Sequence, residues 1–123
     1  MTKRILVADD DNDIREMLIT LLTDFGYETI SAKDGKQAEE KIKSEVFDLA
    51  ILDVSMPFTN GYHLCYQITT QTDRKPAKVI IITARDPEKD KMIGTVSGAE
   101  VYITKPFEYK ELLKKVTELI GKP

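Results

Sequence analysis

The chain has 123 residues, the length of one domain spanning residues 1–123, with enough buried surface for a hydrophobic core of its own. Hydrophobic residues make up 41% and charged residues 32%, a composition that argues against disorder, and apolar runs such as residues 79–82 are far too short to cross a membrane. Eighteen basic against 21 acidic residues disfavour direct binding to nucleic acid, while one cysteine and the lack of a signal-peptide pattern indicate a cytoplasmic protein.

Apolar strand-like runs alternate along the chain with segments of helical periodicity. The predicted strands cover residues 5–8, 29–32, 49–52, 79–82 and 101–103. Hydrophobic spacing predicts helices most clearly over residues 14–25 and 109–120. A third helix, residues 35–45, follows Asp34 with Gln37 in capping-box spacing, and the signals over 62–70 and 89–97 are weaker.

This alternation predicts an α/β fold of the flavodoxin-like, doubly wound (βα)5 type. Parallel strands buried on both faces are typically continuous apolar runs, so we expect helices on both faces of a five-stranded sheet. The strand order expected for such a sheet is 2-1-3-4-5. Residues 29–32 alternate between polar and apolar, which places this strand at an edge of the sheet.

Polar residues follow four of the five predicted strands. Asp9 and Asp10 follow the first, Asp53 the third, Thr83 the fourth, and Thr104 with Lys105 the fifth. Each residue alone has an ordinary explanation, such as a helix cap for the aspartates or a surface charge for the lysine. Because the carboxyl ends of parallel strands meet at one edge of the sheet, their joint placement favours a functional site.

The chemistry of this predicted site is that of phosphoryl transfer. Clustered carboxylates repel one another and need a cation, and a few carboxylates completed by water suit Mg²⁺. A calcium-binding EF-hand loop is excluded, since Ile14 stands where that loop needs glycine and Thr20 where it needs glutamate. A carboxylate would accept the phosphoryl group as an acyl phosphate, while the metal, a lysine and a threonine hydroxyl neutralise charge on the phosphoryl oxygens.

Five motifs in order make the whole chain resemble the receiver domain of two-component response regulators, the family of the chemotaxis response regulator. The matching stretches are residues 4–11, 48–57, 82–84, 98–99 and 102–107, together with Asn60 and Gly61. The resemblance implies that Asp53 is the phosphoacceptor and that Mg²⁺ is the cofactor. It implies metal ligation by Asp10, by Asp53 and by the main-chain carbonyl of Ser55, with Asp9 acting through a bound water.

The resemblance also implies a conformational switch. Lys105 would pair with the phosphoryl oxygens, Thr83 would bond the phosphoryl group, and Tyr102 would follow Thr83 inward. Ser55 and Arg85 would tune the access of water to the acyl phosphate. A cis peptide bond is expected between Lys105 and Pro106, an X-Pro bond being the only place where the cis form costs little.

The implied function is phosphorelay signal transduction in a two-component system rather than enzymatic turnover. A sensor histidine kinase or phosphotransfer protein would donate the phosphoryl group, and the face formed by residues 83–120 would then control a protein target or an output domain. Whether the chain acts alone or belongs to a larger regulator stays open.

A rival from another class is a Mg²⁺-dependent phosphatase similar to the haloacid dehalogenases. These enzymes also use an aspartate nucleophile, and the Asp9-x-Asp11 pattern matches their first motif. Against this rival, the chain is short for a substrate-covering cap, and the second acidic pair expected beyond the lysine is missing after Lys105.

Overall fold

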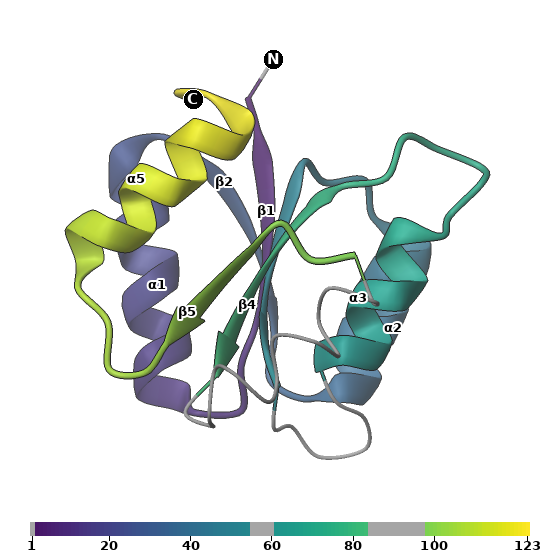
Figure 1. Cartoon of the computed structure of the whole chain (residues 1–123), viewed down its shortest axis with the longest axis horizontal. Coiled ribbons are helices and arrows are strands. Elements are labelled where there is room, and N and C mark those ends of the chain that lie inside the picture. Colours follow the sequence, from purple (N-terminus) through teal and green to yellow (C-terminus); the bar gives the residue numbers. More distant parts are fainter. Residues whose placement is uncertain (1, 55–60, 84–97) are drawn as a thin grey trace.

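The computed structural model describes residues 2–54, 61–83 and 98–123, and in this part of the chain a parallel sheet separates two layers of helices (Figure 1). The strands are β1 (Arg4–Ala8), β2 (Glu28–Ala32), β3 (Leu49–Asp53), β4 (Lys78–Thr83) and β5 (Val101–Thr104). They pair in the order β2-β1-β3-β4-β5, each pair parallel. The predicted fold class and strand order are therefore confirmed, with the second strand at an edge.

The described helices are α1 (Asn12–Phe25), α2 (Gly35–Ser44), α3 (Gly61–Thr69) and α5 (Tyr109–Ile120). Figure 1 shows α1 and α5 on one face of the sheet and α2 and α3 on the other. The helix predicted over residues 89–97 lies outside the described residues. None of the described helices is both long and apolar enough to cross a bilayer.

Alternating side chains of the strands supply the two hydrophobic cores. In β1, Ile5 and Val7 pack with α1 and α5, whereas Leu6 and Ala8 pack with α2 and α3. Successive side chains on a strand point to opposite faces, so a continuous apolar run serves both cores at once.

Short-range caps begin two of the helices as the sequence predicts. The side chain of Asp11 accepts hydrogen bonds from the backbone amides of Asp13 and Ile14 at the start of α1. At the start of α2, Asp34 accepts a bond of 2.8 Å from the amide of Gln37, whose side chain in turn accepts from the amide of Lys33. These bonds satisfy backbone amides that lack a partner within the helix.

A distant segment caps the carboxyl end of α2. The guanidinium of Arg74, which precedes β4, donates to the carbonyls of Glu45 at 2.7 Å, Lys43 at 3.3 Å and Ile42 at 3.4 Å. The side-chain amide of Gln71 also donates to the carbonyl of Ile42, at 3.1 Å. A positive charge at a helix carboxyl end is favourable because the last carbonyls carry partial negative charge.

The end of α5 is fixed to the start of the sheet in the same way. The hydroxyl of Tyr27 donates to the carbonyl of Gly121 at 2.6 Å, and the ammonium of Lys3 donates to the carbonyl of Ile120. Burial raises the pKa of the Tyr27 hydroxyl, since a tyrosinate in this position would lose its hydration.

Replacing Arg74 by methionine tests the long-range cap. Arg74→Met keeps most of the aliphatic stem but removes every guanidinium bond, so we expect the free energy of unfolding to fall by about 1–2 kcal/mol. Lys75→Met is the matched control: it removes a neighbouring exposed charge and is expected to change stability by no more than about 0.5 kcal/mol. Urea denaturation measures the free energy of unfolding of both variants. Equal losses of stability would contradict a stabilising role of Arg74 at the end of α2.

The pH dependence of stability tests the Tyr27 contact. Because its pKa is raised in the folded state, the folded protein holds the proton more tightly than the unfolded chain does. This contribution is complete below about pH 10, the ordinary tyrosine value, and is lost as pH rises through the folded-state pKa. Tyr27→Phe is expected to cost about 1 kcal/mol at pH 7.

The difference in the free energy of unfolding between the wild type and Tyr27→Phe should therefore shrink above pH 10. Urea unfolding across the pH range measures this difference. Tyr66→Phe, which removes an exposed hydroxyl, serves as the control and should match the wild type at pH 7. A stability difference between the wild type and Tyr27→Phe that grows with pH would contradict a Tyr27 pKa raised by folding.

Candidate functional site

Four strands deliver polar side chains to the carboxyl edge of the sheet, toward which the arrowheads point in Figure 1. Asp9 and Asp10 follow β1, Asp53 is the last residue of β3, Thr83 is the last residue of β4, and Lys105 follows β5. One carboxylate oxygen from each of the three aspartates lies within 4.8 Å of the others. The structure therefore brings together the acidic residues that the sequence analysis selected.

The ammonium of Lys105 bridges two of these carboxylates. Its Nζ lies 3.2 Å from Oδ2 of Asp9 and 3.5 Å from Oδ1 of Asp53. Burial alone would lower the pKa of Lys105, but the charges and hydrogen bonds of the two carboxylates outweigh it and raise the pKa. Lys105 is therefore a permanent cation at neutral pH. The Lys105–Pro106 peptide bond is cis, in agreement with the resemblance.

Asp9 is buried and held by its own neighbours. It is 2% exposed, its Oδ1 accepts from the amide of Asp11 at 2.9 Å, and its amide donates to the carbonyl of Ala32 at 3.2 Å. Arg15, on the first turn of α1, donates to the carbonyl of Asp9 at 2.8 Å. The contact with Lys105 and the bond from the Asp11 amide fix the side chain of Asp9, and the bonds to Ala32 and Arg15 hold its backbone. Asp10, by contrast, is exposed.

Asp53 and Thr83 end neighbouring strands. Asp53 is 6% exposed and pairs with Ile82 across the β3–β4 ladder, so Thr83 lies one residue further along β4. Thr83 is 1% exposed, and its carbonyl accepts from the amide of Lys105 at 2.8 Å. This bond ties the start of the β5–α5 connection to the end of β4.

Gly61 allows α3 to begin directly against the backbone of Asp53. A Cβ at Gly61 would lie 2.5 Å from the carbonyl oxygen of Asp53 and 3.2 Å from Cα of Val54. The amide of Gly61 donates to the carbonyl of Val54 at 3.1 Å. A side chain at this position would force apart α3 and the end of β3, because a contact of 2.5 Å to backbone is not tolerated.

Tyr102, on β5, is half-buried and packs against the core shared by α2 and α3. Two residues expected to tune the site, Ser55 and Arg85, lie outside the described residues. Gly61 was noted in the sequence only as part of the resemblance, without a structural reason. The part played by Arg15 was missed, since nothing local marks Arg15 as a partner of the Asp9 carbonyl.

The donor set fits a hard divalent cation. The three clustered groups are all carboxylates, two of them buried, and oxygen ligands of this kind are those that Mg²⁺ prefers. Among the described residues, one ammonium faces three carboxylates, so this part of the site keeps an excess of negative charge that a divalent ion would balance.

Comparisons with known proteins agree on one family. The model of the response regulator receiver domain matches residues 5–117. The chain is 38% identical over 120 residues to the alkaline phosphatase synthesis transcriptional regulatory protein PhoP of Bacillus subtilis, which covers 98% of this chain. The chain spans about half the length of that relative, 49%.

Solved structures give the same result. The response regulator TrrA of Thermotoga maritima, in complex with Mg²⁺-BeF, superposes with a TM-score of 0.84 at 36% identity, covering 97% of this chain and all of that one. The chemotaxis response regulator CheY4 of Vibrio cholerae gives a TM-score of 0.89 at 33% identity, covering 98% and 100%. These likenesses do not favour the phosphatase alternative, and the chain belongs to the family of response regulator receiver domains.

Proposed function

We propose that residues 1–123 form one receiver domain that takes a phosphoryl group from a histidine kinase or phosphotransfer protein onto Asp53, in the cytoplasm. The observation that carries the proposal is the bridging of Asp9 and Asp53 by Lys105 beside Asp10. An acidic cluster that already holds one fixed cation at the acceptor is suited to receive a group with several negative oxygens.

In the proposed reaction an oxygen of Asp53 attacks the phosphorus of a phosphohistidine. The P–O bond forms as the P–N bond breaks, and the donor ring, which carries a proton on its other nitrogen before the transfer, leaves as neutral imidazole. Lys105 then exchanges its contact with Asp53 for a phosphoryl oxygen, while Asp9 continues to hold it. The hydroxyl of Thr83 donates to a second phosphoryl oxygen.

Mg²⁺, when bound, would neutralise charge on the transferred group. Asp10 and Asp53 would hold it directly, joined by the main-chain carbonyl of Ser55, and Asp9 would act through water. The carboxylate cluster supports this assignment, since the oxygens of three aspartates converge there.

The surroundings of Lys105 support a protein as phosphoryl donor. A cavity of about 420 Å³ lies next to it, lined by Ile14, Met17, Lys105, Pro106, Phe107 and Tyr109. This surface is largely apolar and includes Lys105, which contacts the acceptor, so a donor that presents a phosphohistidine to Asp53 would contact it.

The signal would leave through the face of residues 83–120. The described part of that face, β5 and α5, is joined to the site by the bond from Lys105 to the carbonyl of Thr83. Movement of Thr83 toward a phosphoryl group would therefore pull on the β5–α5 connection, and Tyr102 would repack with it. Such a change in surface would control a partner or an output domain.

Mass spectrometry after treatment with acetyl phosphate tests the acceptor. With Mg²⁺ the chain should gain one phosphoryl group, and it should gain none in Asp53→Asn or when the metal is removed with a chelator. Asp48→Asn, at the opposite end of β3, is the matched control and should be labelled like the wild type. Labelling that persists in Asp53→Asn would contradict the assignment, as would continuous turnover of a generic phosphate ester.

Gly61→Ala tests whether the contact between α3 and β3 positions the acceptor. The added Cβ would displace the backbone of Asp53, so we expect phosphorylation by acetyl phosphate to slow by about tenfold or more. Gly26→Ala is the control for stability: Gly26 has φ of 118° at the far end of α1, so alanine there is strained but distant from the site.

Both alanine variants should unfold at lower urea concentration than the wild type. Only Gly61→Ala should lose phosphorylation rate. If both variants were phosphorylated at the wild-type rate, Gly61 would contribute to the stability of the fold but not to the position of the acceptor.

A further inference from the structure

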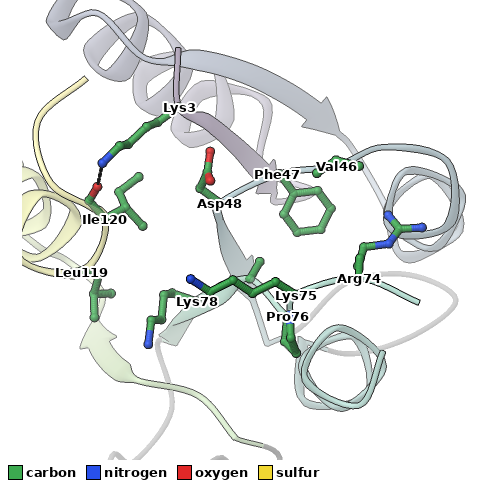
Figure 2. Close-up of a pocket in the computed structure, with 11 residues that line it drawn as sticks. Lys3, Val46, Phe47, Asp48, Arg74, Lys75, Pro76, Lys78, Leu119 and Ile120 are labelled. Carbon is green, nitrogen blue, oxygen red and sulfur yellow. Dashed lines mark hydrogen bonds between the residues drawn. The ribbon is translucent and has the colours of Figure 1, made fainter. Parts of the chain in front are cut away.

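A pocket lies at the amino-terminal edge of the sheet, opposite the acidic site. It has a volume of about 370 Å³ and opens between the starts of β3 and β4 and the end of α5 (Figure 2). Its apolar lining consists of Val46, Phe47, Pro76, Ala77, Leu119 and Ile120. Val46 is 64% exposed, which is high for a large aliphatic side chain in a pocket.

The charges around this pocket are mostly positive. Lys3, Arg74, Lys75 and Lys78 line it with a single acidic residue, Asp48. The whole chain carries a net charge of −3, so this edge has the opposite sign to the molecule and to the aspartate cluster. Such a separation of charge orients an approaching anionic partner toward this edge.

Two of the four cations are already engaged. Lys3 donates to the carbonyl of Ile120, and Arg74 caps the end of α2. Lys75 and Lys78 are exposed and make no ion pair with another residue in the described part of the chain. Figure 2 shows both side chains extending toward the Leu119 side of the pocket.

Backbone geometry argues against a phosphate as the occupant. The amide of Asp48 donates to the carbonyl of Arg4 at 2.8 Å, and the amide of Lys78 donates to the carbonyl of Asp48 at 3.1 Å. These strand amides are therefore not available to a ligand. The described helix ends at this edge are carboxyl ends, such as those of α2 and α5, so no helix amino terminus of the described chain offers its free amides to a phosphate here.

We infer that the pocket docks an acidic protein segment. An aliphatic or aromatic side chain of that segment would lie on the apolar lining, and its carboxylates would pair with Lys75 and Lys78. Exposed ion pairs contribute little each and are screened by salt, so the interaction is weak, salt-sensitive and quickly reversible. This surface is separate from the acceptor site and shares only Leu119 and Ile120 with the face of residues 83–120.

Titration of the ¹⁵N-labelled chain with a short peptide of alternating glutamate and leucine tests the inference. Amide signals of Val46, of Lys75, Ala77 and Lys78, and of Leu119 and Ile120 should shift. Lys75→Glu/Lys78→Glu should weaken the apparent affinity by about tenfold or more. Lys110→Glu/Lys114→Glu on α5 makes the same change in net charge away from the pocket and should leave the affinity within about twofold.

Three results would overturn the inference. Inorganic phosphate at equal ionic strength could shift the same amides, which would identify a simple anion site. Equal weakening by both double variants would indicate attraction by net charge alone. Shifts of the same amides on raising the protein concentration without peptide would assign the surface to a second copy of the chain.

Discussion

The contact of one ammonium with two buried carboxylates, Lys105 with Asp9 and Asp53, is the constraint on which the rest of the site depends. Without that cation, two buried negative charges would face each other at the end of a hydrophobic sheet, at a cost that burial makes large. With it, a positive charge lies between the two carboxylates, and the remaining negative charge of the cluster is available to a divalent ion. The lysine reaches this position because β5 ends beside β4, whose last carbonyl accepts the Lys105 amide.

The parallel topology gives the molecule two chemically different edges. Strand carboxyl ends collect aspartates at one edge, where α1 and α3 begin. The opposite edge receives the carboxyl ends of α2 and α5, and their carbonyls are met by Arg74, Gln71, Tyr27 and Lys3. Lys3 and Arg74, which close these helices, therefore supply part of the positive charge of the second edge, and Lys75 and Lys78 supply the rest. One edge is suited to phosphoryl chemistry and the other to an acidic protein surface.

Local patterns in the sequence predicted the strands, the strand order and the acidic residues that meet at one edge. Apolar runs such as residues 79–82 are long enough for a buried strand and too short for most helices, so the run predicted β4. The capping pair of Asp34 and Gln37 predicted the start of α2. Contacts between distant segments could not be predicted this way. Arg74 reaches the end of α2 across about thirty residues of sequence, and the closeness of Gly61 to the Asp53 carbonyl depends on how α3 packs. Nor does spacing indicate that Lys105 lies nearer to Asp9 than to Asp53.

The most direct test of the account is a crystal structure of the chain with Mn²⁺, located by its anomalous scattering, and beryllofluoride as a stand-in for the phosphoryl group. The account predicts the ion between Asp10 and Asp53, the beryllium bonded to an Asp53 oxygen, and Lys105 in contact with a fluorine while it retains Asp9. An ion bound elsewhere, or beryllofluoride on a different carboxylate with Lys105 still bridging Asp9 and Asp53, would contradict it.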